Sequence, residues 1–229
     1  MVVGGIFDTG DYYSVFFVIA GAILYALQLY IDFSGYVNIA SGVALCFGIE
    51  LTPNFDTPYF ARNISDFWRR WHISLSNWLR DFIYIPLGGN RKGKIRKNVN
   101  LFATFFVSGI WHGANWTFII WGIYHGIISI LNTITYPIGE KIRNKFKIKK
   151  EGILCSAYQM ITTSLLVAFG WIFFRANDIK TALAMIKGLF NFDFSNLIGK
   201  TQDLCRENGL EESQGIILAV FLVIWLVVE

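Results

Sequence analysis

Residues 100–136 read NLFATFFVSGIWHGANWTFIIWGIYHGIISILNTITY and contain no Asp, Glu, Lys or Arg. A helix needs about 20 predominantly apolar residues to cross a bilayer. At 1.5 Å per residue, this stretch would give about 55 Å of helix, too long for one span and enough for two short ones. The stretch therefore predicts a helical hairpin that enters the membrane and returns.

The turn of this hairpin should fall where helix propensity is lowest. Residues 113–115, Gly-Ala-Asn, are the best candidate, with Ser108 and Gly109 just before them. A turn there would place His112 deep in the membrane. Non-helical backbone at that depth is tolerated only where it is buried in protein or lines a cavity. We therefore expect an internal cavity next to His112.

The composition of the whole chain indicates an integral membrane protein. Its 229 residues are 54% hydrophobic and 16% charged, whereas soluble domains average about 45–50% apolar and about 25% charged residues. This excludes a disordered chain and a disulfide scaffold. Further candidate spans are residues 12–31, 153–174 and 214–228, with residues 35–51 as a short second crossing. We expect one membrane-embedded domain over residues 1–229, all-α and polytopic.

Two short loops carry most of the positive charge. Residues 91–97 hold five basic side chains and no acid, and residues 141–150 hold six more. Short basic loops next to membrane spans tend to stay in the cytoplasm. They predict a multi-pass protein of the cell membrane whose basic loops contact lipid headgroups. A nucleic-acid partner is not expected, because its site would need these charges on a soluble face.

Residues 63–81 differ from the spans because apolar and basic side chains alternate at helical spacing. Phe67, Trp71 and Leu75 share one face, and Asn63 or Ser65 can cap the start. The segment predicts an amphipathic helix in the membrane interface, next to the cavity. His72 falls on the apolar side of this helix.

Three histidines are the candidates for chemistry. His112 lies mid-span, where an ionisable residue is expensive and marks a functional site by default; a purely structural hydrogen bond fits its position equally well. His125 and, taken alone, His72 are more typical of packing. A histidine shielded from water stays neutral and can accept a proton from a hydroxyl. Nearby Trp and Asn N–H groups could stabilise an oxyanion.

Other chemistries lack their sequence signatures. There is no phosphate-binding GxxxxGK[ST] loop, no GxSxG, no HExxH and no GxGxxG. The three histidines and three cysteines are too scattered to offer metal-ligand spacing, so no metal is expected. Transfer of a group directly to a hydroxyl, with histidine as the base, is the economical mechanism.

Several long motifs, in order, resemble the membrane-bound O-acyltransferase family. They are residues 31–36 (IDFSGY), 67–81 (FWRRWHISLSNWLRD), 84–91 (YIPLGGNR), 109–116 (GIWHGANW), 121–126 (WGIYHG) and 170–175 (GWIFFR). The resemblance covers residues 12–190. Residues 86–93 look like the bacterial alginate and peptidoglycan O-acetyltransferase branch. The D-alanyl-teichoic-acid transferase branch shares the Trp-His motifs and looks less similar around residues 88–93.

The resemblance implies a helical membrane protein around a central tunnel. It implies an enzyme that moves an acetyl group from a cytoplasmic thioester donor, acetyl-CoA, toward hydroxyls of an extracytoplasmic polysaccharide. No bound cofactor is implied, and a secreted or membrane-anchored partner often completes the transfer. It also implies a protein about twice as long, of which this chain is a C-terminal portion.

The roles of two histidines follow the same resemblance, and the other candidate site residues are their neighbours and nearby basic residues. The two family histidines fall on His112, as the catalytic base, and on His72, which supports it. Asn115 and Trp111 are expected to orient the base or the thioester. Arg69 and Arg70 are weaker candidates for contacts with donor phosphates, as are Arg91 and Lys92.

Two alternatives from other classes stay open. In a transporter or channel subunit, His112 would serve as a proton relay along the same cavity. In a non-catalytic scaffold for a secreted acetyltransferase, His112 would be dispensable.

Overall fold

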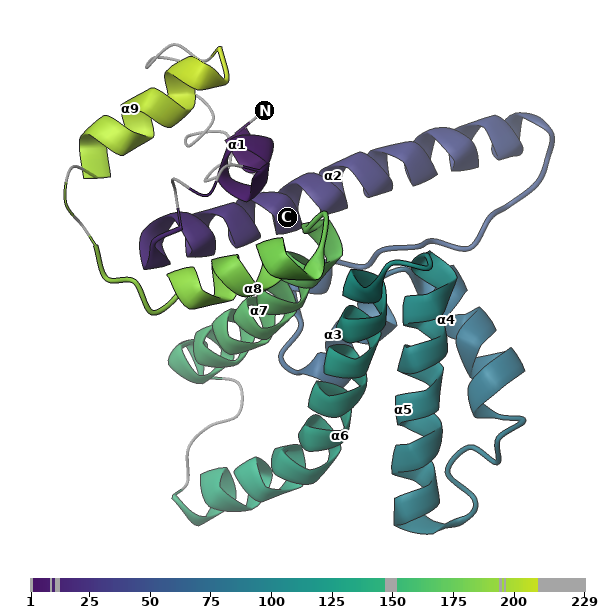
Figure 1. Ribbon diagram of the computed structural model, residues 1–229. Coiled ribbons are helices and arrows are strands. Elements are labelled where there is room, and N and C mark those ends of the chain that lie inside the picture. The colour runs from purple at the N-terminus through teal and green to yellow at the C-terminus, as the bar shows by residue number, and fades with distance from the viewer. Residues whose placement is uncertain are drawn as a thin grey trace. The chain divides into compact units, whose positions relative to one another are not determined.

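The computed structural model describes residues 2–8, 10, 13–146, 152–193, 195 and 197–209. Within these ranges every regular element is a helix, so the predicted all-α class is confirmed (Figure 1). The predicted span at residues 214–228 lies outside the described residues. The elements are α1 (Val2–Asp8), α2 (Val15–Cys46), η2 (Pro58–Phe60), α3 (Ile64–Arg70), α4 (Ile73–Leu79), η3 (Arg80–Tyr84), α5 (Gly93–His112), α6 (Trp116–Lys145), α7 (Ile153–Arg175), α8 (Ile179–Gly188) and α9 (Leu197–Glu207).

Three of the described helices are long and apolar enough to cross a membrane: α2, α6 and α7. Helix α7 matches the predicted span at residues 153–174. Helix α2 differs from the prediction, because it continues without a break from the first predicted span into residues 35–46 of the segment expected to form a second crossing. Gly35 and Gly42 weaken helix propensity but do not stop the helix. No proline interrupts it, and the backbone therefore continues to Cys46.

The predicted helical hairpin is present as α5 and α6, of which α6 is among the three span-capable helices and α5 is not. Helix α5 ends at His112 and α6 begins at Trp116, so the break falls at residues 113–115 as predicted. Gly113 has φ 154°, a conformation that favours glycine. Asn115 caps α6, because its side-chain oxygen accepts a hydrogen bond from the Thr117 amide at 3.1 Å.

Small residues let α5 and α6 pack closely along the hairpin. A Cβ added to Gly109 would lie 2.5 Å from the Phe118 carbonyl oxygen, and one added to Gly122 would lie 2.5 Å from the Phe105 carbonyl oxygen. Glycines at such positions are how membrane helices bring their backbones together. The close approach fixes the position of the His112 end of α5.

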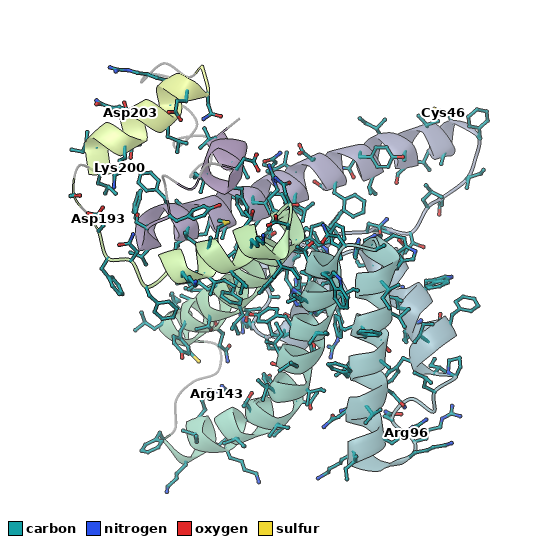
Figure 2. All side chains as sticks on the ribbon, viewed as in Figure 1. Cys46, Arg96, Arg143, Asp193, Lys200 and Asp203 are labelled. Atoms are coloured by element: carbon teal, nitrogen blue, oxygen red, sulfur yellow. The ribbon has the colours of Figure 1, made fainter. Side chains whose placement is uncertain are left out.

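The hairpin also brings basic residues from the two charged loops to one end. Figure 2 shows Arg96, early in α5, and Arg143, late in α6, at the ends of these helices that lie away from the turn. This agrees with the prediction that both loops face one side of the membrane. Residues 147–150 of the second loop lie outside the described residues.

The prediction of a single amphipathic helix over residues 63–81 is wrong in one respect. The chain forms two short helices, α3 and α4, and the break is at His72, whose backbone is left-handed (φ 46°, ψ 55°). Asn63 caps α3 as predicted, accepting a hydrogen bond from the Asp66 amide at 2.9 Å. The break has a tertiary cause: the preceding segment pairs with it through an isolated antiparallel bridge between Phe55 and Trp71.

A single π-helical turn, η3, continues α4 and leads into the glycine-rich loop before α5. Gly88 and Gly89 both have positive φ. The buried Asn100 side chain donates a hydrogen bond to the Gly89 carbonyl oxygen at 2.9 Å. This bond ties the loop to the first half of α5.

The chain divides into two compact units, residues 28–174 and residues 1–27 with 175–229. In the second of these, Asp8 at the end of α1 accepts hydrogen bonds from Arg175 at 3.2 Å and from Asn177 at 3.0 Å. The first unit contains the hairpin, α3, α4 and η3. The expectation of one domain over residues 1–229 stays a prediction.

We expect Gly109→Ala to destabilise the protein by about 1–3 kcal/mol, because the new methyl group would be forced into the backbone of α6. The measurement is the thermal unfolding midpoint in detergent. The matched control is Gly139→Ala, also on a hairpin helix, where the nearest atom to the added Cβ is 3.5 Å away. Equal midpoints for the two variants would contradict close packing at Gly109.

Candidate active site

A cavity of about 330 Å³ lies within residues 28–174, and His72 and His112 both line it. The predicted cavity next to His112 is therefore confirmed. Its walls are mainly aromatic and aliphatic side chains from α2, α3, α4, α5, α6 and α7. Ligand sites are commonly apolar cavities with a few converging polar groups.

One wall of the cavity is a stripe along α5. Leu101, Thr104, Phe105, Ser108 and His112 all line it. Leu101, Phe105, Ser108 and His112 follow one another at steps of three or four residues, and Thr104 is four residues before Ser108, so all five lie on one face of the helix. From Leu101 to His112, a rise of 1.5 Å per residue gives a length of about 16 Å. The cavity is therefore elongated along α5.

A second wall comes from α4 and η3. His72, Ser76, Arg80 and Tyr84 line it, again at a spacing of three or four residues. The η3 turn packs against α5, and the Trp111 ring packs against both His72 and His112, so the two walls have their histidines at the same end. The other end lies beside the glycine-rich loop, where Asn100 of α5 holds Gly89.

Aromatic rings pack against the His112 imidazole at the end of α5. The centroid of its imidazole lies 4.9 Å from Phe174 and 5.1 Å from Trp121, with interplanar angles of 82° and 89°. Such edge-to-face contacts fix a ring without using its polar atoms. In the part of the chain that the structure describes, no side chain or backbone group hydrogen-bonds to the His112 ring, so its nitrogens are available to a substrate.

His72 reaches the cavity from the break between α3 and α4. Its ring packs edge-on against Phe33 of α2 with a centroid distance of 4.8 Å, and its Nδ1 lies 3.3 Å from Oδ1 of Asn54. His72 lies outside the three span-capable helices. Burial lowers the pKa of His72 to about 4, because desolvation disfavours the charged ring. At neutral pH His72 is an uncharged imidazole.

Trp111 connects the two histidines, although it does not line the cavity. Its ring centroid lies 5.0 Å from that of His112 and 6.4 Å from that of His72. Asn115 also lies outside the cavity lining, is exposed, and caps α6. Of these two predicted orienting residues, the structure places Trp111 against both imidazoles.

The two neighbouring arginines have different environments. Arg69 lines the cavity, and among the described residues it has no carboxylate partner. Arg70 does not line the cavity. Its guanidinium donates hydrogen bonds to Asp66 at 3.1 Å and to Thr57 at 3.2 Å. The structure thus brings only Arg69 to the candidate site.

His125 is completely buried behind the cavity. Its ring packs against Trp68 and Trp121, each at a centroid distance of 4.9 Å. A Cβ on Gly170 of α7 would collide with its Nε2, so the glycine leaves room for this ring. The expectation that His125 serves packing agrees with these contacts. Through Trp121 it supports the ring that holds His112.

Sequence reasoning missed several cavity residues. Thr104 and Ser108 could have been found, because they precede His112 at helical spacing in the charge-free stretch. Asn54 could not, since it lies 18 residues from His72 and contacts it only because of the left-handed turn. Phe174 likewise comes from a distant helix.

The arrangement suits group transfer to a hydroxyl. Two imidazoles from distant segments meet at one end of an elongated apolar cavity, His72 uncharged and His112 without a hydrogen-bond partner among the described residues. Either can accept a proton from a hydroxyl within hydrogen-bond reach. Holding two reactants in such a space replaces a bimolecular encounter by an oriented one.

Comparisons with known proteins agree with this chemistry. The model of the membrane-bound O-acyltransferase family matches residues 11–165. A probable alginate O-acetylase of Pseudomonas aeruginosa is 40% identical over 205 residues, covering 89% of this chain and 36% of that protein. The peptidoglycan O-acetyltransferase of Helicobacter pylori is 45% identical over 166 residues, covering 72% of this chain and 30% of that protein.

A teichoic acid D-alanyltransferase of Bacillus subtilis is more distant, at 33% identity over 157 residues, covering 66% of this chain and 39% of that protein. The chain spans about a third of the length of these curated relatives. The family match covers more than half of the chain and includes both histidines, the hairpin and every cavity-lining residue except Trp171 and Phe174. This chain belongs to the membrane-bound O-acyltransferase family and is an integral membrane protein.

Proposed function

We propose that the protein transfers an acetyl group from a cytoplasmic thioester, acetyl-CoA, toward hydroxyls of an extracytoplasmic polysaccharide. The observation that carries this proposal is the meeting of His72 and His112 at one end of a cavity that runs along α5. The relatives named for O-acetylation of alginate and of peptidoglycan support acetyl as the group transferred.

In this proposal His112 is the general base. The imidazole removes the proton of the acceptor hydroxyl as its oxygen attacks the thioester carbonyl carbon. The carbon–sulfur bond then breaks, and the proton passes from the imidazolium to the departing thiolate. The aromatic rings of Trp121 and Phe174 keep the imidazole in place during both steps.

His72 supports His112 from the opposite wall. As a second neutral imidazole in the same cavity, it can accept a hydrogen bond from the acceptor hydroxyl and orient it. Trp111, which packs against both rings, keeps their relative position.

The donor enters, in this proposal, from the end of the cavity away from the histidines. That end lies beside the glycine-rich loop and the basic residues 91–97, where a short basic loop favours the cytoplasmic side. Coenzyme A carries phosphates, and the guanidinium of Arg69 in the cavity wall, which has no carboxylate partner among the described residues, can contact one of them. Arg91 and Lys92 are exposed and can contact others.

The proposal also includes the partner that receives the acetyl group. We infer a multi-pass protein of the cell membrane that passes acetyl groups to a secreted or membrane-anchored transferase, which completes O-acetylation of the polysaccharide. D-alanyl transfer to teichoic acid would use the same pair of histidines. The lower identity of the D-alanyltransferase favours acetyl transfer.

The proposal predicts that His112→Ala in the complete protein lowers acetyl transfer by about a hundredfold or more, because the base is lost. The assay follows polysaccharide O-acetylation in cells and hydrolysis of acetyl-CoA by the purified protein without an ion gradient. Expression level and size-exclusion profile serve as folding controls. Normal transfer by a well-expressed variant would end the assignment of His112 and favour the scaffold alternative.

Substitution of His72 should reduce acetyl transfer less than substitution of His112 does, but still substantially. We expect His72→Ala to reduce acetyl transfer at least tenfold while His72→Gln retains more activity, because glutamine can still donate and accept a hydrogen bond. The measurement is the initial rate with saturating acetyl-CoA. Equal rates for wild type and both variants would show that His72 only packs.

The donor contact is tested by Arg69→Gln. Removing the guanidinium should raise KM for acetyl-CoA severalfold and leave kcat nearly unchanged, because the lost contact binds donor before and during transfer alike. Arg96→Gln is the control, since Arg96 lies near the end of α5 that is away from His112 (Figure 2) and does not line the cavity. A KM that moves equally in both variants would indicate general surface charge rather than a specific contact.

A further inference from the structure

We infer that Asn54 is a positioning residue that sets the tautomer of His72, so that Nδ1 carries the proton and Nε2 is the nitrogen that accepts one. The inference rests on the role proposed above for His72. Nothing in the motif around His72 identifies Asn54, which lies in the loop before the short helix η2.

The backbone of Asn54 is fixed against the turn that holds His72. The Ile73 amide donates a hydrogen bond to the Asn54 carbonyl oxygen at 3.0 Å, and the Asp56 amide donates one to the Arg70 carbonyl oxygen at 3.0 Å. These two bonds enclose the antiparallel bridge between Phe55 and Trp71. The Asn54 side chain therefore has a defined position relative to the imidazole.

The hydrogen bonds around the side-chain amide of Asn54 identify whether its oxygen or its NH₂ group faces the turn at His72. The Ser74 amide donates to Oδ1 at 3.0 Å, and the Ser74 hydroxyl lies 2.6 Å from the same atom. A backbone N–H can only donate, so the atom facing it must be the carbonyl oxygen rather than the NH₂ group.

The same oxygen lies 3.3 Å from Nδ1 of His72. A carbonyl oxygen can only accept, so this contact is a hydrogen bond only when Nδ1 carries the proton. In a neutral imidazole the other nitrogen then has the free lone pair. Asn54 thus leaves Nε2 as the basic nitrogen of a ring that lines the cavity.

The left-handed backbone at His72 makes this support necessary. Non-glycine residues seldom adopt positive φ, and such conformations persist only where surrounding contacts hold them. At φ 46° the turn directs the ring toward Phe33 and Trp111, and the Asn54 segment provides the bonds that hold the turn. Asn54 therefore determines both the place of the ring and its protonated nitrogen.

The direct test is nitrogen-15 NMR of labelled histidine in the complete protein in lipid nanodiscs, with the His72 signals assigned by their loss in His72→Gln. We expect the Nδ1–H form at neutral pH in the wild type and a shift toward the Nε2–H form in Asn54→Leu. Ser74→Ala is the matched control, because it removes a bond to the same oxygen without touching the ring. A predominant Nε2–H form in the wild type, or an unchanged tautomer in Asn54→Leu, would overturn the inference.

A second arm uses Asn54→Asp, which keeps an acceptor beside Nδ1 and adds a negative charge. The carboxylate should raise the pKa of His72. Since Nε2 of His72 can accept a hydrogen bond from the hydroxyl only when the ring is neutral, the acidic limb of the pH–rate profile should move up by about one pH unit. Asn144→Asp, exposed near the end of α6, controls for added charge elsewhere. The charged and titratable groups on the elements around His72 are His112, Arg69 and Arg80 of the cavity lining, the pair of Asp56 with Arg70, and Asp32, which precedes the His72 contact Phe33 in α2.

The two arms separate the two proposals. An acidic limb that stays in place in Asn54→Asp, while the wild type transfers acetyl groups, contradicts the inference about Asn54. A wild type that transfers no acetyl group contradicts the proposed function, and the NMR measurement then still decides whether Asn54 sets the tautomer.

Discussion

The close packing of α5 against α6 is the constraint on which the candidate site depends. Gly109 and Gly122 bring the two backbones so near that a single added methyl group would meet a carbonyl oxygen. This contact fixes the end of α5, where His112 lies between Trp121 of α6 and Phe174 of α7. The same helix end closes the stripe of cavity-lining residues that runs from Leu101 to His112.

The second wall depends on a local departure from helical structure. A continuous helix over residues 63–81 would have kept His72 on a regular helical face. The left-handed turn at His72 instead directs its ring into the cavity, and the bonds to the Asn54 segment hold that turn. The site is thus formed where one hairpin is regular and tightly packed, and where an opposing helix is broken.

The parts that the sequence predicts are those fixed by local patterns. The charge-free stretch around His112 predicts the hairpin, and the low helix propensity of residues 113–115 predicts its turn, because both follow from solvation and backbone preference. The break at His72 and the continuous helix through Gly35 could not be predicted in this way. The break at His72 requires pairing with a segment 18 residues away. At Gly35 the low helix propensity of glycine favours an interruption, but this apolar segment stays helical. Arg70 shows the same limit, because its hydrogen bonds to Asp66 and Thr57 become visible only in the fold.

The central claim is that the thioester is held at the histidine end of the cavity. A cryo-electron microscopy structure of the complete protein with a non-hydrolysable acetyl-CoA analogue tests it most directly. The account predicts the carbonyl of the analogue within hydrogen-bond reach of His112 or His72, with its arm lying along Ser108 and Thr104. An analogue bound outside this cavity, or bound with its acyl end toward Tyr84, would contradict it.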